Sequence, residues 1–139
     1  MYWERRTWHR ECFYWGMLSI TVALGCGSPG TAPTVPARGM LLHNGKPAQA
    51  ARIIFTPKSG RPATGNTDDE GRFVLSTFES DDGAVPGEHT VTVSDLKRNW
   101  NQDPSKSRFP IAYERPNTTP LVVEVEPDNE NSFSFNMKN

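Results

Sequence analysis

Cysteine is almost absent from this chain of 139 residues, because Cys12 and Cys26 are its only two and both lie near the amino terminus. The sequence after Cys26 therefore predicts a domain with no disulfide and no cysteine-based metal site. A strong charge of either sign is also missing, since 15 Lys and Arg residues nearly balance 16 Asp and Glu residues. This balance argues against a nucleic-acid-binding surface.

Long apolar runs and helical periodicity are missing too. The apolar run Phe13–Leu24 has 12 residues, whereas a helix that crosses a bilayer needs about 20. No segment sustains the 3.6-residue apolar period of a helix. With 12 prolines and 11 glycines, the composition favours one domain built from short strands and turns.

The amino-terminal segment is typical of an export signal. Three arginines, Arg5, Arg6 and Arg10, precede an apolar run that has the length of a signal-peptide core. Ala23-Leu24-Gly25-Cys26 follows and resembles the lipobox of bacterial lipoproteins, in which the cysteine receives a diacylglycerol and becomes the new amino terminus.

This resemblance implies a signal peptide at residues 1–25 and acyl chains, palmitate among them, on Cys26. Two or more acyl chains hold a protein firmly on a membrane. Since Gly27 is not Asp, the lipoprotein rule implies an anchor in the outer membrane of a two-membrane cell envelope. Plain secretion and an uncleaved anchor stay open, because Ala23 and Gly25 also satisfy the small-residue rule of ordinary cleavage.

Residues 26–36 are the predicted tether between the lipidated cysteine and the domain. Gly27–Pro36 contains three prolines and no apolar periodicity, which indicates an extended linker of up to about 30 Å. The alternative is that the last residues of this segment lie along the edge of the domain.

Residues 37–139 are predicted to form an all-β domain. Seven short strands alternate with turns, at Arg38–Leu42, Arg52–Pro57, Ala63–Thr67, Arg72–Phe78, Glu88–Ser94, Leu121–Glu126 and Ser132–Asn136. Alternation places Ile53 and Phe55 inside and puts Met40 and Leu42 on one face of the first strand. Seven strands at this spacing predict an antiparallel β-sandwich.

Four motifs follow one another in this domain. They are GMLLHNGKPA at Gly39–Ala48, IFTP at Ile54–Pro57, TDDEGRF at Thr67–Phe73 and PGEHTVTV at Pro86–Val93. Their order resembles the carboxypeptidase regulatory-like domain, a transthyretin-like sandwich with DGKP, TDADGRF and PGxYxVxV motifs. The chain departs from that pattern at Asn44 and His89, where the family has Asp and an aromatic residue.

The ending Pro110–Leu121 is similar to that of small planctomycete lipoproteins which carry this domain. The resemblance covers residues 37–139 and implies the fold. It implies no activity, because this domain is a structural module on many unrelated proteins.

Clustered carboxylates at Asp68, Asp69 and Glu70, with Asp81 and Asp82 on a loop that follows, are candidates for a calcium site. Calcium binds six to eight oxygen ligands. The spacing does not match an EF-hand loop, and the alternative is that these residues form turns and solvated charges.

The segment from Leu96 to Pro120 exceeds the usual loop length and combines basic with aromatic residues, the composition of a recognition surface. Trp100, Phe109 and Tyr113 are the candidate contacts with an envelope protein or polysaccharide. In the alternative, Phe109, Ile111 and Tyr113 pack over an open end of the sheet.

No serine stands in a nucleophile-elbow motif, and no glycine-rich phosphate loop is present. We therefore expect a membrane-anchored envelope lipoprotein whose domain binds or scaffolds, catalyses nothing and uses no cofactor. One alternative is an accessory module that binds carbohydrate or peptide. The other is a metal-dependent enzyme of transthyretin-like type that uses His43, His89 and Tyr113.

Overall fold

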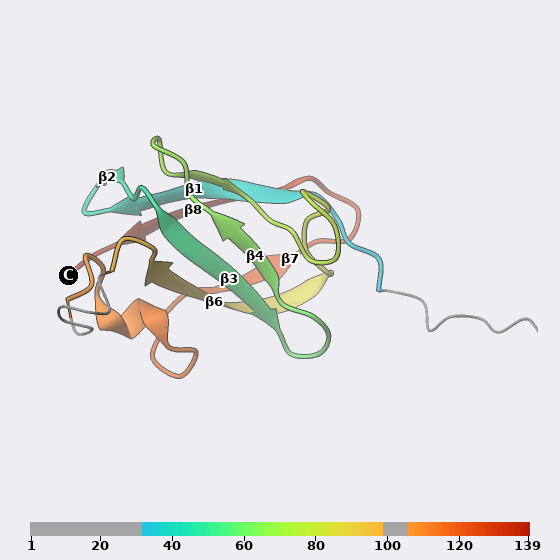
Figure 1. Ribbon diagram of the computed structural model, residues 1–139. Coiled ribbons are helices and arrows are strands. Elements are labelled where there is room, and N and C mark those ends of the chain that lie inside the picture. Colours follow the sequence, from blue (N-terminus) through green and yellow to red (C-terminus); the bar gives the residue numbers. More distant parts are fainter. Residues whose placement is uncertain (1–31, 99–105) are drawn as a thin grey trace, which may run out of the picture. The chain divides into compact units, whose positions relative to one another are not determined.

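The computed structural model describes residues 32–98 and 106–139, and these residues form an all-β domain with two four-stranded sheets (Figure 1). The domain belongs to one compact unit, Thr31–Asn139. The predicted signal peptide, Cys26 and Trp100 lie outside the described residues. Within the two described ranges, no helix is long and apolar enough to cross a membrane.

The first sheet is organised around β1 (Ala37–His43). Strand β8 (Asn131–Met137) runs parallel to β1 along its whole length. Two antiparallel strands, β2 (Lys46–Pro47) and β5 (Arg72–Val74), pair with the two ends of β1 along its other edge.

The second sheet has the order β4-β3-β6-β7, and all its pairs are antiparallel. Its strands are β3 (Ala51–Pro57), β4 (Ala63–Asn66), β6 (Gly87–Asp95) and β7 (Val122–Val125). A single turn of 3₁₀-helix, η1 (Ile111–Glu114), lies between β6 and β7 in the chain.

The two sheets meet along one side. Thr64 of β4 and Ser76, which follows β5, exchange two backbone hydrogen bonds of 2.9 Å. A single core then fills the space between the sheets, an arrangement consistent with a β-sandwich.

Phe55 of β3 is the residue that joins the two faces of this core. Its ring centroid lies 5.2 Å from that of Phe133 and 6.0 Å from that of Phe135, both in β8 of the other sheet. It also lies 6.2 Å from the ring of Phe73 in β5. Phe55 and Ile53 are fully buried, which confirms the inward positions that alternation predicts.

The buried face of β1 is not the face that carries Met40 and Leu42. Met40 and Leu42 share one face, as expected, but Met40 is 38% exposed whereas Leu41 is fully buried. At Gly39 on the same strand, an added Cβ would lie 2.3 Å from the carbonyl oxygen of Phe133 in β8. The absence of a side chain there permits the close approach of β1 and β8.

Two sequence expectations about the strands are wrong. The described part of the chain has eight strands, because the two-residue strand β2 follows the Asn44-Gly45 turn. The arrangement is not wholly antiparallel either, since β8 is parallel to β1. Inward and outward residues alternate in parallel and antiparallel pairs alike, so this pattern does not reveal the direction of pairing. No turn motif joins β1 and β8 either, because the two strands are far apart in the sequence.

The Asn44-Gly45 turn itself forms as predicted. Asn44 and Gly45 have φ angles of 50° and 78°, and a tight hairpin turn needs positive φ at both central residues.

The last part of the predicted tether belongs to the folded domain. Val35 exchanges two backbone hydrogen bonds with Ala84, of 2.9 and 3.1 Å. The folded region therefore begins before Ala37, and the alternative of a tether that ends along the domain edge applies to its last residues. Because β1 and β8 run parallel, the beginning of the domain and its carboxyl terminus lie at opposite ends (Figure 1).

Candidate functional site

An open groove of about 1230 Å³ lies over outward-facing residues of both sheets. Three strands, β1, β3 and β5, each contribute an arginine followed two positions later by an apolar residue. These six lining residues are Arg38, Met40, Arg52, Ile54, Arg72 and Val74. Ser132 and Ser134 of β8 and Asn66 of β4 add hydroxyl and amide groups. Asp68 and Asp81 also line the groove, so it offers charges of both signs together with hydrogen-bonding groups and apolar surface.

Two of the groove arginines are held by carboxylates of the same chain. Arg38 forms an ion pair with Glu130, and Arg72 Nε lies 3.2 Å from Asp68 Oδ2. The side chains of Arg38 and Arg72 are 59% and 62% exposed. Exposed ion pairs contribute only about 0–1 kcal/mol, so a carboxylate of a ligand can replace these partners at small cost.

Arg52 has a neutral partner in the groove. Its Nε donates a hydrogen bond of 3.4 Å to Asn66 Oδ1 on the neighbouring strand β4. This contact orients the guanidinium without neutralising its charge, which makes Arg52 the best placed of the three arginines to attract an anion.

Asp68 forms the turn before β5. Its Oδ1 accepts hydrogen bonds from the amides of Arg72 and Glu70, at 2.7 and 3.0 Å. The amide of Arg72 lowers the pKa of Asp68 from 3.8 most strongly. Burial opposes this effect, and the Arg72 side chain and the Glu70 amide lower the pKa further. Gly71 completes the turn with a φ of 76°.

Asp82 performs a similar role in the next loop. Its carboxylate accepts amide hydrogen bonds from Thr77, Phe78 and Glu79, at 2.6, 2.9 and 3.1 Å. Burial raises the pKa of Asp82, but these amides outweigh burial and the pKa falls below 3.8. Two of the carboxylates proposed for calcium, those of Asp68 and Asp82, are thus engaged with backbone amides or with arginine.

The calcium candidates do not form a coordination shell in the described structure. Glu70 pairs with Arg72 at 3.1 Å, and Asp69 is exposed on the turn. Within residues 32–98 and 106–139, no group of three or more His, Cys, Asp or Glu side chains is arranged to hold a metal ion. The local geometry is that of turn formers.

The histidines considered for a metal-dependent enzyme lie in different sheets. His89 of β6 is fully buried, with Nε2 2.8 Å from the carbonyl oxygen of Val85 and its ring beside Phe55. His43 ends β1, and its Nε2 lies 3.0 Å from Asn139 Oδ1. His89 therefore occupies a position inside the core.

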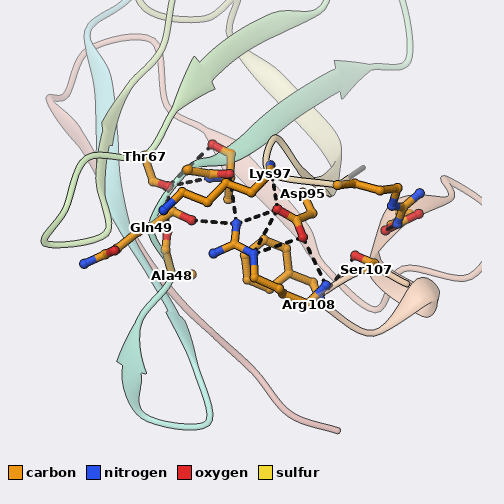
Figure 2. A network of polar contacts seen from close by, with 12 residues as sticks. Ala48, Gln49, Thr67, Asp95, Lys97, Ser107 and Arg108 are labelled. Carbon is orange, nitrogen blue, oxygen red and sulfur yellow. Dashed lines mark hydrogen bonds and ion pairs between the residues drawn. The ribbon is translucent and has the colours of Figure 1, made fainter. Parts of the chain in front are cut away.

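Asp95 and Arg108 anchor the segment between β6 and β7 (Figure 2). The Asp95 side chain is 2% exposed. It accepts hydrogen bonds from Arg108 Nε at 3.0 Å, from the Arg108 amide at 3.1 Å and from the Lys97 amide at 2.9 Å. Arg108 Nη2 also donates to the carbonyl oxygens of Gln49 and Ala50, at 3.1 and 3.3 Å.

These contacts have a clear electrostatic consequence for Asp95. Burial raises the pKa of its carboxyl group, but the hydrogen bonds and charge of Arg108 and the Lys97 amide outweigh burial and lower the pKa from 3.8 to about 2. A second ion pair, between Arg98 and Glu114, is also shielded from solvent, since the two side chains are 8% and 12% exposed. Both pairs connect the end of β6 to the segment that carries η1.

The two described aromatic residues of this segment take part in packing. Phe109 is 5% exposed and belongs to the core, with its ring 5.6 Å from that of His43. Tyr113 packs against the core, and its hydroxyl oxygen accepts a hydrogen bond of 3.3 Å from the Lys138 amide. Phe109 thus leaves almost no surface for a partner, in agreement with the alternative that these rings cover an open end of the sheet. That alternative is wrong for Ile111, which is 58% exposed because it lies on the outer side of the 3₁₀ turn η1.

Comparison of the chain with models of protein families, with curated proteins and with solved structures gave no significant match. The resemblance to the carboxypeptidase regulatory-like domain therefore rests on the four motifs alone and stays a prediction.

Sequence reasoning did not find the groove arginines. A signal was present, because each of three predicted strands carries an arginine on the face opposite to its buried residues. Only the arrangement of β1, β3 and β5 brings the three positions to one groove. It also missed the Asp95–Arg108 pair, since nothing local relates two residues 13 positions apart across a predicted loop.

Proposed function

We propose that the chain is an envelope lipoprotein, anchored by acyl chains on Cys26, whose β domain binds or scaffolds and catalyses nothing. The observation that carries the proposal is the run Ala23-Leu24-Gly25-Cys26 at the end of the 12-residue apolar segment Phe13–Leu24. The compact β unit supports it, because this unit starts only at Thr31 and the lipidated cysteine would precede it in the chain.

Intact-mass spectrometry of the protein isolated from its native membranes tests the anchor. We expect a mature chain that begins at Cys26 and carries acyl groups, and a Cys26→Ser chain that lacks them and leaves the membrane fraction. The loss follows because about 0.8 kcal/mol of membrane affinity per buried CH₂ disappears with the acyl chains. An unmodified Cys26 in the soluble fraction would contradict the proposal.

We further infer that the two sheets form a transthyretin-like sandwich of the carboxypeptidase regulatory-like type. Support comes from the positions of the motifs on the domain. Thr67–Phe73 makes the turn into β5, with Gly71 at a φ of 76°, and Pro86-Gly87 leads into β6. An experimental structure with another strand order would contradict this assignment.

For the binding activity, we propose that the groove accepts an acidic polysaccharide of the envelope. Arginine pairs with carboxylates through two parallel hydrogen bonds. Met40 and Val74 are 38% and 45% exposed, so they provide apolar contacts for the faces of sugar rings. The proposal deepens the alternative of a carbohydrate-binding module.

Binding of the purified full chain to polygalacturonate, with neutral dextran as comparison, tests the groove. We expect binding to polygalacturonate alone. Arg52→Gln should weaken it about tenfold, because a charge-assisted hydrogen bond contributes roughly 1.5 kcal/mol.

Arg115→Gln is the matched control, since Arg115 is exposed and does not line the groove. We expect this variant to bind as the parent chain does. An equal loss in both variants, or equal binding of the two polymers, would contradict the groove as the site.

A further inference from the structure

One edge of the first sheet is open in the described structure. Strand β8 pairs with β1 and with no other strand of residues 32–98 and 106–139. The bonds at its two ends, Asn131 N to Pro36 O and Asn44 N to Met137 O, show which residues face β1. In a parallel ladder alternate residues direct their backbone groups to one side.

The outward backbone groups of β8 therefore belong to Ser132, Ser134 and Asn136. All three residues are exposed. The next residue with this orientation is Lys138, whose amide already donates to the hydroxyl oxygen of Tyr113. The free edge thus extends from Ser132 to Asn136 and is closed beyond it.

This edge lacks the features that normally prevent strands from pairing. Natural edge strands carry charges, prolines or bulges, or are very short. The sequence of β8, Asn-Ser-Phe-Ser-Phe-Asn-Met, has neither charge nor proline across seven residues that pair without interruption with β1. By contrast, the edge strand β7 has only four residues and carries Glu124.

We propose that β8 pairs with β8 of a second copy of this chain, antiparallel, about a two-fold axis at Ser134. In this register Ser134 lies opposite Ser134 of the partner, and Ser132 lies opposite Asn136. All three outward residues then exchange backbone hydrogen bonds with outward residues of the partner. A two-fold axis makes the contact self-complementary and closes it at two copies.

The charges that flank β8 select this partner and this register. Glu130 precedes the strand and Lys138 follows it. With Ser134 on the axis, Glu130 of each copy lies opposite Lys138 of the other, so that both ends of the pair gain opposite charges. Arg38 is the other charged group at the Glu130 end, and it pairs with Glu130 within the chain.

The side chains of β8 fit the same arrangement. Phe133 is only partly buried against the core, and in the proposed pair it lies beside Phe135 of the partner on the inner face. The Ser132 and Ser134 side chains stay on the outer face, where they line the groove. Self-pairing therefore leaves the groove open, and the proposal does not depend on what the groove binds.

A cysteine cross-link of the full chain tests the register. In a chain with Cys12 and Cys26 replaced by Ser, we introduce Ser134→Cys and oxidise mildly. The two Cα atoms should lie about 5.5 Å apart, within the range for a disulfide. We expect a cross-linked dimer from Ser134→Cys and none from Ser132→Cys, since the two copies of residue 132 would lie about 14 Å apart along the strands.

The double variant Ser132→Cys with Asn136→Cys restores the cross-link if the register is right. Sedimentation measures the charge contribution independently. Lys138→Glu should weaken the dimer about tenfold, because two attractive pairs become repulsive. Adding Glu130→Lys to that variant should recover most of the loss, since the opposite charges then face one another again.

A chain that sediments as a monomer and gives no cross-link from either Ser134→Cys or the double variant would overturn the proposal. Equal cross-linking of Ser132→Cys and Ser134→Cys would overturn it as well, because it would indicate random collision. An extended peptide that binds to the β8 edge of a monomeric chain would assign the edge to a different partner and would also refute self-pairing.

Discussion

Replacing Phe55 by Ala is expected to lower the free energy of unfolding by about 3–5 kcal/mol. The ring is fully buried and contacts Phe73, Phe133 and Phe135 of the opposite sheet. Its removal leaves a cavity at the contact between the two sheets, where neither sheet can close over it without losing its own pairing. A domain of this size has about 5–15 kcal/mol of stability in total.

Denaturant unfolding of the full chain measures this loss, and the melting temperature should fall by at least about 12 °C. Met40→Ala is the control, because Met40 is 38% exposed on the outer face of β1. We expect that control to change stability by no more than about 1 kcal/mol. A similar loss in the two variants would mean that Phe55 does not connect the sheets.

Asp95→Asn is expected to destabilise the protein by about 2 kcal/mol at neutral pH and to loosen the segment that carries η1. The carboxylate is almost fully buried and receives donors from Arg108 and Lys97. An amide in its place loses the charge and directs an NH₂ group at these donors. Arg108 is 41% exposed and regains some hydration, which limits the loss.

The effect of Asp95→Asn depends on pH with a definite sign. The pKa of Asp95 is about 2 in the folded protein and 3.8 in the reference state, so the carboxylate stabilises the fold above about pH 4 and loses this effect as pH falls through 2. The difference corresponds to about 2 kcal/mol at pH 7 and to about half of that at pH 3.

Unfolding of the parent chain and the variant at several pH values, together with amide hydrogen exchange at Phe109 and Tyr113, measures both effects. We expect the stability difference to shrink as the pH is lowered, and faster exchange to be confined to the segment around η1. Asp69→Asn is the control, because Asp69 is exposed on its turn. A difference between parent and variant that stays constant from pH 7 to pH 3 would refute the assigned role of Asp95.

Local features of the fold were predictable because they depend on neighbouring residues. Asn44 and Gly45 adopt the positive φ angles that their turn demands. Ile53 and Phe55 are buried, as alternation along their strand predicts. Each of these outcomes follows from backbone sterics or from the two-residue period of a strand. Both depend only on a few adjacent residues.

Partnerships between distant segments were not predictable in the same way. The pairing of β8 with β1 is parallel, although the sequence predicts an antiparallel sandwich. Phe109 enters the core although it lies in a segment interpreted as a recognition loop. A segment with basic and aromatic residues can form an exposed binding surface, or it can pack its aromatic side chains against the core. Only the burial of those side chains in the folded domain distinguishes the two cases.

The sequence by itself determined the all-β character of the domain, the Asn44-Gly45 turn and the inward positions of Ile53 and Phe55, because alternation and turn chemistry act over a few residues. Only the tertiary structure decided that Arg38, Arg52 and Arg72 share a groove, that Asp95 meets Arg108, and that β8 remains an edge. These features arise when strands far apart in the chain become neighbours. Such pairing depends on the packing of the whole core, which no local pattern encodes.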